Sequence, residues 1–159
     1  MESAVQRQAR FRHPRYRRCR AAGLRVGLGV DGQASADVAD PFQNMRTGLY
    51  LLRATAGDAK VMSSREILRM HTLGSAEALG VEDGVGSLEP GKFADFVVLD
   101  PERPSTGPLA PDLYAHSVLA LSAANITDVR VGARSVSTGL FEPATNAVHE
   151  RVAALRALL

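Results

Sequence analysis

The 159-residue sequence has a mass of 17.0 kDa, 45% hydrophobic and 23% charged residues, and a formal net charge of +2, values typical of one ordinary globular domain or two small ones. No apolar run approaches the roughly 20 residues of a membrane span, and the single Cys19 excludes an internal disulfide and a cysteine-based zinc site. The N-terminal region lacks the apolar stretch of a secretory signal, so we expect a cytoplasmic protein with no membrane partner.

Positive charge is concentrated at the start of the chain. Residues 1–25 hold eight arginines and one acid, Glu2, whereas residues 26–159 hold 11 basic and 16 acidic residues. Residues 1–20 show neither a helical nor an alternating apolar pattern, and we expect them to form a disordered basic arm. Such an arm binds nucleic acid or an acidic surface, or remains a solvated tail. We expect no nucleic-acid partner, and keep nucleic-acid binding by the arm as an alternative.

The first half of the body predicts one strand followed by helices. Residues 24–30 form an apolar run typical of a short buried strand, which ends at Asp31 and Gly32. A polar loop from Gln33 to about Asp40 follows. Asp40 and Pro41 suit the N-cap and first position of a helix. The spacing predicts one apolar face on this helix, which Gly57 and Asp58 end, formed by Phe42, Met45, Leu49 and Leu52.

A second helical region follows, and the chain then changes character. Ser63 and Glu66 fit a capping box that opens a helix; Gly74 is expected to interrupt it, and Gly80 to end the short turn that comes next. Pro90 and Gly91 suit the centre of a type II turn.

The second half predicts short strands. Residues 94–99 favour a strand, 114–123 a strand or a short helix, and 126–136 a pair of short strands, with a proline-rich irregular connection after the first of these. The spacing predicts a final helix with one apolar face, formed by Val148, Val152, Leu155 and Leu159.

The glycines of the first predicted strand allow two interpretations. Gly27, Gly29 and Gly32 match the G-x-G-x-x-G pattern of dinucleotide-binding folds. That fingerprint needs a helix opening at its last glycine and an acid about 20 residues on, and neither is present. Asp31-Gly32 alone is most often a hairpin turn. Because the polar run after it leads to a helix and not to a second strand, we favour Asp31 at the carboxyl end of a buried strand, where it faces an active site as in barrels and open α/β sheets. A carboxylate there can ligate a metal or accept a proton.

The histidines give no independent sign of a metal centre. None of the four pairs as H-x-H or H-x-x-x-H, and we expect each to be a surface or packing residue: His13, His71, His116 and His149. No cluster of metal ligands is visible in this sequence.

Three stretches together resemble the metal-dependent amidohydrolase superfamily, in its branch of cytosine deaminases, guanine deaminases and triazine chlorohydrolases. They are Val-Gly-Leu-Gly-Val-Asp-Gly at 26–32 with Ala34-Ser35 and Met45-Arg46; Ala-Glu-Ala-Leu-Gly at 76–80 with Gly-Ser-Leu-Glu-Pro-Gly-Lys at 86–92 and Ala-Asp-Phe-Val-Val-Leu-Asp at 94–100; and Ile-Thr-Asp-Val-Arg-Val-Gly at 126–132. The resemblance runs from about residue 21 to residue 140 and matches the C-terminal part of that superfamily.

The resemblance implies an α/β fold, the C-terminal portion of a TIM-like barrel with its last strand and following helices, plus part of a small β-sandwich. On this basis we expect a basic arm at 1–20, a partial barrel segment at 21–80, a β-sandwich segment at 81–140 and a C-terminal helix at 141–159. The roughly 250 residues of a complete barrel exceed the length of this chain.

The resemblance also implies a hydrolase acting on non-peptide carbon–nitrogen bonds, of the amidohydrolase or deaminase type. It implies a Zn²⁺ or Fe²⁺ ion, a small heterocyclic amine as substrate, and Asp31 as metal ligand and proton acceptor. The superfamily's H-x-H pair is absent here, so we expect no stable metal binding and no turnover by this chain alone. The alternative is a non-catalytic fragment that assembles with another copy or with an upstream chain.

Overall fold

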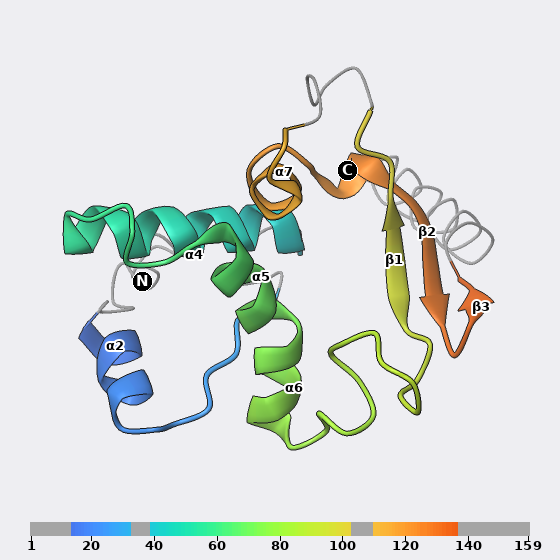
Figure 1. Ribbon diagram of the computed structural model, residues 1–159, viewed down its shortest axis with the longest axis horizontal. Helices are drawn as coiled ribbons and strands as arrows, with labels where there is room; N and C mark the ends of the chain where they lie inside the picture. Colours follow the sequence, from blue (N-terminus) through green and yellow to red (C-terminus); the bar gives the residue numbers. More distant parts are fainter. Residues whose placement is uncertain (1–13, 33–38, 103–109, 137–159) are drawn as a thin grey trace, which may run out of the picture.

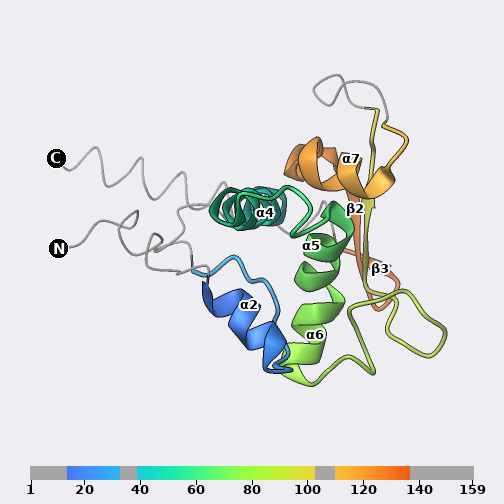
Figure 2. The same ribbon diagram turned by 60° about the vertical axis from the view of Figure 1, so that its left-hand side comes forward.

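The computed structural model describes residues 14–32, 39–102 and 110–136, which form helices and one small antiparallel sheet. In two views, helices α2 and α4 lie on one side, the sheet lies on the other, and α5 and α6 lie between them (Figures 1 and 2). The elements in chain order are α2 (Pro14–Ala21), α4 (Pro41–Ala56), α5 (Ser64–His71), α6 (Leu73–Leu79), β1 (Phe96–Leu99), α7 (Leu113–Leu119), the 3-10 helix η1 (Ala123–Asn125), β2 (Ile126–Val131) and β3 (Arg134–Ser135).

Helix α4 begins and ends where its sequence predicts. The Asp40 side chain accepts hydrogen bonds from the backbone N–H groups of Phe42 and Gln43, at 2.8 and 3.3 Å, with Pro41 in the first turn. Gly57 ends the helix at φ 63°, in the left-handed region that favours glycine. The predicted apolar stripe of α4 is buried, so the spacing of its apolar residues is confirmed.

Helices α5 and α6 are capped as predicted, although the break between them lies earlier than expected. Ser63 and Glu66 form both hydrogen bonds of a capping box, at 3.2 and 2.8 Å. Gly80 ends α6 at φ 72°. The two helices meet at Thr72, whereas the expected break at Gly74 is wrong, because Gly74 lies buried within α6.

The core lies between the helices. Residues 114–123, for which the sequence allowed a strand or a short helix, are mostly helical and belong to α7. Arg46 of α4 donates hydrogen bonds to the carbonyl oxygens of Val118 and Leu121, near the end of α7. The buried apolar cluster consists of Phe42, Met45, Leu49, Leu52, Met62, Ile67, Met70, Val118 and Leu121.

The sheet has the order β1-β2-β3, and both pairs of strands are antiparallel. The β2–β3 connection is a two-residue turn in which Gly132 and Ala133 both have positive φ, at 55° and 67°, which suits the twist of a hairpin. The turn around Pro90 and Gly91 also forms, with Gly91 at φ 95° and the Lys92 N–H bonded to the Glu89 carbonyl at 3.2 Å. The strand predictions for 94–99 and 126–136 are therefore confirmed.

Residues 24–32 differ from the sequence prediction. They form an irregular segment, and within the described ranges they pair with no strand. Their partners are instead the helices, because the Leu28 N–H donates to the Met70 carbonyl at 3.2 Å. An apolar run can pack against either a strand or a helix. Here Val26 and Leu28 are partly buried against the helical core, and the expected burial of the whole run is wrong.

The end of the basic arm also differs from the expectation of disorder. Helix α2 covers the arm from residue 14, and Tyr16 packs against the apolar cluster. Arg20 lies 3.7 Å from the Glu66 carboxylate on α5. Packing against the body thus orders a segment whose own sequence pattern does not favour a helix.

Two of the predictions concern the two ends of the chain, which the structure does not describe. The predicted C-terminal helix at 141–159, with His149, and residues 1–13, with His13, lie outside the described residues. None of the helices in the described ranges combines the length and the hydropathy of a membrane span.

Candidate functional site

Asp31 lies at the end of the irregular segment, with its side chain exposed. Its backbone adopts φ 62°, in the left-handed region that few residues other than glycine, asparagine and aspartate occupy. The Gly32 N–H donates to Asp31 Oδ1 at 2.7 Å, which fixes the orientation of the carboxylate relative to its own backbone. No strand flanks Asp31 within residues 14–32, so the described part of the chain does not place it in a β-hairpin.

The segment that carries Asp31 is held by side chains of two helices. The Leu28 carbonyl accepts from His71 Nδ1 at 2.9 Å and from the Ser75 hydroxyl at 3.2 Å. The Leu28 N–H donates to the same hydroxyl at 3.2 Å. From α4, Asn44 Nδ2 donates to the Gly29 carbonyl at 2.9 Å, two residues before Asp31. The position of Asp31 is therefore tied to α4, α5 and α6.

A carboxylate oxygen fits one ligand position of a divalent metal, but a complete site needs several ligands. Within the described ranges, no group of three or more His, Cys, Asp and Glu side chains could hold a metal ion. His71 bonds to Leu28, and His116 is buried in α7, where its Nδ1 accepts from the Ala110 N–H at 3.3 Å. The described residues thus provide Asp31 without a complete metal centre around it.

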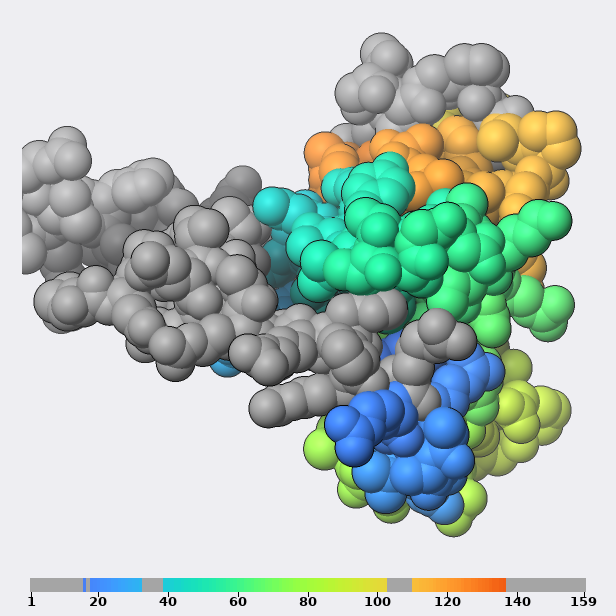
Figure 3. Space-filling view, turned by 90° about the vertical axis from the view of Figure 1, so that its left-hand side faces the viewer, coloured from blue at the N-terminus to red at the C-terminus, as the bar shows by residue number. Residues whose placement is uncertain are grey.

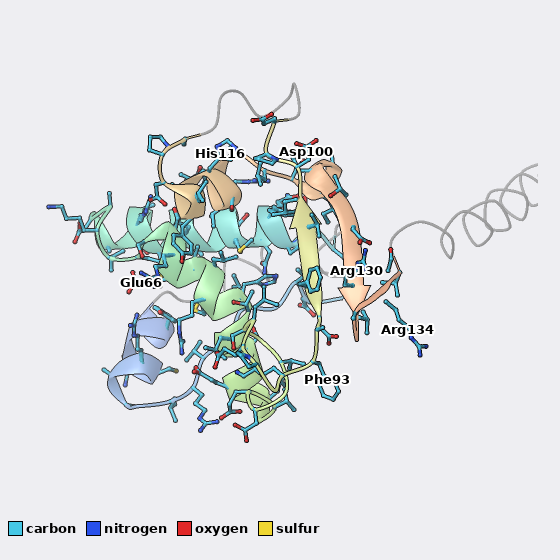
Figure 4. The ribbon with its side chains drawn as sticks, turned by 45° about the vertical axis from the view of Figure 1, so that its right-hand side comes forward. Glu66, Phe93, Asp100, His116, Arg130 and Arg134 are labelled. Atoms are coloured by element: carbon cyan, nitrogen blue, oxygen red, sulfur yellow. The ribbon has the colours of Figure 1, made fainter. Side chains whose placement is uncertain are left out.

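The other charged side chains are spread over the molecule. Figure 4 shows Glu66 beside α2, His116 on α7, and Arg130 on the sheet, so these titratable groups come from separate parts of the fold. The pKa of Glu66 is below its ordinary value because the Ser63 backbone N–H and hydroxyl donate to its carboxylate. Both bonds belong to the helix cap, and this shift therefore reports on structure and not on a catalytic site.

An open cavity of about 240 Å³ is lined by residues of α2, the segment after it, α5 and α6. Figure 3 shows α2, in blue, on the lower part of the face turned to the viewer, with α4 above it. The charged groups of the cavity are largely paired: Arg69 bonds to Glu77 at 2.5 Å, and Arg25 bonds to Glu82 at 2.5 Å. Asp31 does not line this cavity. The sequence analysis proposed none of its lining residues as a site residue, because they come together only when α2 contacts the rest of the folded chain.

Comparison with known proteins shows which family this chain belongs to. The model of the amidohydrolase family matches residues 11–136. The match confirms the resemblance found in the sequence. It begins ten residues before the segment at 21–140 that carried the resemblance, and so includes part of the basic arm.

A curated relative is a 5-methylthioadenosine/S-adenosylhomocysteine deaminase of Pelotomaculum thermopropionicum, 42% identical over 115 residues. The match covers 72% of this chain and 26% of the relative. The chain therefore spans about a quarter of the length of the curated relatives that it matches.

Two solved structures are similar in both fold and sequence. An adenosine deaminase from Xanthomonas campestris with bound zinc has a TM-score of 0.73 and 32% identity, covering 83% of this chain and 31% of that chain. A triazine hydrolase variant has a TM-score of 0.67 and 29% identity, covering 81% of this chain and 30% of that chain. Since the family model matches well over half of the sequence, the chain belongs to the amidohydrolase family.

Proposed function

We propose that the chain provides Asp31 to the active site of a metal-dependent hydrolase that removes an amino group from a small heterocyclic amine. The proposal is supported by membership of the amidohydrolase family and by the deaminase activity named for the Pelotomaculum relative. The observation that carries it is the exposed Asp31 carboxylate, at φ 62°, at the end of a segment anchored to three helices. Residues in such sparsely populated conformations cluster at functional sites.

In this proposal Asp31 has two roles. A divalent Zn²⁺ or Fe²⁺ ion, when bound, lowers the pKa of a coordinated water toward neutrality. The Asp31 carboxylate would supply one oxygen ligand to that ion. It would also take a proton from the water that attacks the carbon and pass it to the nitrogen that departs. The hydrogen bond from the Gly32 N–H to Oδ1 restricts the carboxylate to one orientation, which general acid–base catalysis requires.

We propose that the remaining ligands come from a different polypeptide segment. The sequence contains no H-x-H pair, and no group of three or more metal-ligating side chains forms among the described residues. Leu24, at the start of the irregular segment, is 59% exposed although the run it belongs to is apolar. Exposed apolar surface on this segment favours packing against a further polypeptide segment. We therefore expect no turnover by the chain alone.

The domain assignment is a proposal of the same kind. Family membership implies a TIM-barrel-type fold, and we propose residues 21–80 as a segment of that barrel. The three-stranded antiparallel sheet supports the assignment of residues 81–140 to a β-sandwich.

The experiment is a segment exchange in the Pelotomaculum deaminase. The part of that enzyme that matches this chain is replaced by the corresponding part of this chain, and ammonia release from 5-methylthioadenosine is measured with zinc. We expect an active hybrid and a loss of at least about 100-fold in kcat for Asp31→Asn. The control is Asp58→Asn, which removes another exposed carboxylate, just after α4.

Two outcomes contradict the proposal. One is an active hybrid whose activity is unchanged by Asp31→Asn. The other is zinc-dependent deamination by the purified 159-residue chain, because the chain would then hold a complete centre by itself.

A further inference from the structure

Leu28 has an unusual set of hydrogen-bond partners for a residue outside a sheet. In a strand, its backbone N–H and carbonyl would bond to a neighbouring strand. Here both groups are satisfied by one short stretch of helix, from Met70 to Ser75, through a main-chain carbonyl, an imidazole and a hydroxyl. We call the Leu28 peptide groups with His71 and Ser75 the Leu28 anchor.

The chemistry of the Leu28 anchor fixes the tautomer of His71. A carbonyl oxygen only accepts hydrogen bonds, so His71 Nδ1 is the donor in the 2.9 Å contact with Leu28. The neutral ring therefore carries its proton on Nδ1, and Nε2 has the lone pair. Neutral histidine in water favours the opposite form, with the proton on Nε2, which makes the tautomer of His71 a direct report on this contact.

Ser75 contacts the same peptide from α6. Its oxygen accepts from the Leu28 N–H, and its single proton is shared between the carbonyls of Leu28 and Met70, at 3.2 and 3.1 Å. The Ser75 hydroxyl thus acts as donor and acceptor at once, as a neighbouring strand would.

Two glycines allow the close approach on which the anchor depends. A Cβ added to Gly27 would lie 2.6 Å from the Cα of Ser75 and 2.7 Å from its hydroxyl oxygen. From the opposite side, a Cβ on Gly74 would lie 3.2 Å from the Val26 carbonyl. The segment and α6 therefore meet backbone against backbone, a distance that side chains on either partner would prevent.

We propose that His71 and Ser75 are positioning residues, which hold the Leu28 peptide and thereby set the location of Asp31 three residues further on. This inference rests on the proposed role of Asp31. Only Gly29 and Val30 separate the Leu28 anchor from Asp31, so the position of the Leu28 peptide strongly restricts the position of the carboxylate. The Gly29 carbonyl is itself bonded to Asn44. Loss of the anchor leaves Asn44 as the side chain that restrains this stretch and moves the carboxylate away from its working position.

The first test uses the 159-residue chain in solution. Long-range ¹⁵N–¹H correlation spectra of the imidazole report which nitrogen carries the proton, and amide hydrogen exchange reports the protection of the Leu28 N–H. We expect His71 as the Nδ1–H form and a protected Leu28 amide. Ser75→Ala should accelerate exchange at Leu28, whereas Ser87→Ala, a matched change in the loop after α6, should not.

The second test places variants in the active hybrid enzyme. His71→Phe keeps a planar ring but removes the donor, and we expect kcat to fall by roughly 10- to 100-fold with KM unchanged. His71→Asn should restore most of kcat, because its amide Nδ2 stands where Nδ1 of histidine donates. A loss of fold would lower both variants alike, so this rescue separates positioning from stability.

The outcomes distinguish this inference from the proposed function. If Asp31→Asn abolishes activity while His71→Phe and Ser75→Ala do not, the positioning role is wrong and the role of Asp31 stands. If His71 is found with its proton on Nε2, or the Leu28 amide is unprotected, the anchor itself is refuted. If Asp31→Asn leaves the hybrid active, the proposed function fails whatever the spectra show, and the positioning role fails with it.

Discussion

Gly27 and Gly29 lie two residues apart in the same irregular segment, yet their surroundings predict opposite responses to alanine. A Cβ at Gly27 would lie 2.6 Å from the Cα of Ser75, whereas ordinary van der Waals contact begins near 3.4 Å. The two atoms must therefore separate by about 0.8 Å. One of them belongs to the backbone of α6, so the segment or the helix has to move. A Cβ at Gly29 would meet no atom within 4 Å.

Gly27→Ala should lower the free energy of unfolding in two ways. Overpacking that displaces backbone costs about 1–3 kcal/mol, and weakening the Leu28 hydrogen bonds costs about 1 kcal/mol more. The free energy of unfolding should fall by about 2–4 kcal/mol, which for a chain of this length lowers Tm by about 10 °C. Gly29→Ala should change the free energy of unfolding by no more than about 0.5–1 kcal/mol, with stabilisation the expected sign.

Urea unfolding followed by circular dichroism measures both variants against the parent chain. The difference in midpoint between the two alanine variants is the informative quantity, because their intrinsic backbone effects are alike. Equal midpoints for Gly27→Ala and Gly29→Ala would refute the close approach of the segment to α6, and with it the geometry of the Leu28 anchor.

Two further predictions concern the helix caps. Asp40→Ala should lower the free energy of unfolding by about 1 kcal/mol in urea titrations, because two N–H groups of the first turn of α4 lose their acceptor; an unchanged midpoint would argue against the cap. The pKa of Glu66 is lower in the folded chain than its ordinary value of 4.5, owing to the Ser63 backbone N–H and hydroxyl. A carboxyl group whose pKa is lowered by folding stabilises the folded chain at pH values above its ordinary pKa. This contribution to the free energy of unfolding is lost as the pH falls through the folded-state pKa. Glu66→Gln should therefore flatten the pH dependence of the urea midpoint in acid, and a slope identical to that of the parent chain would contradict this assignment.

Local signals in the sequence predict the ends of the helices well. Asp40, Gly57, Ser63 and Gly80 all occupy the capping positions expected of them, because a cap depends on the few residues around it. The strands at 96–99 and 126–131 follow from β-prone runs for the same reason. The family, too, could be identified from short motifs, and Asp31 was selected among the carboxylates by its place in one of them.

Contacts distant in the sequence could not be predicted. Leu28 and Ser75 are 47 residues apart, and nothing local to either indicates that one hydroxyl replaces a neighbouring strand. The helical conformation of residues 14–21 depends likewise on packing of Tyr16 against the body. The apolar run at 24–30 predicted a buried strand, and the structure shows neither: the run is irregular, with Val26 and Leu28 only partly buried against the helices. Periodicity does not say whether such a run packs against a strand or a helix.

The left-handed backbone of Asp31 limits which mutations this position tolerates without damage to the surrounding loop. Asparagine and glycine adopt the same conformation readily, and each is one base change from an aspartate codon. A lineage released from selection for catalysis can therefore lose the acidic group at Asp31 by a single nucleotide substitution and still keep the loop intact. In sequenced relatives, the residue type at this position would then separate active enzymes from inactive descendants that fold equally well.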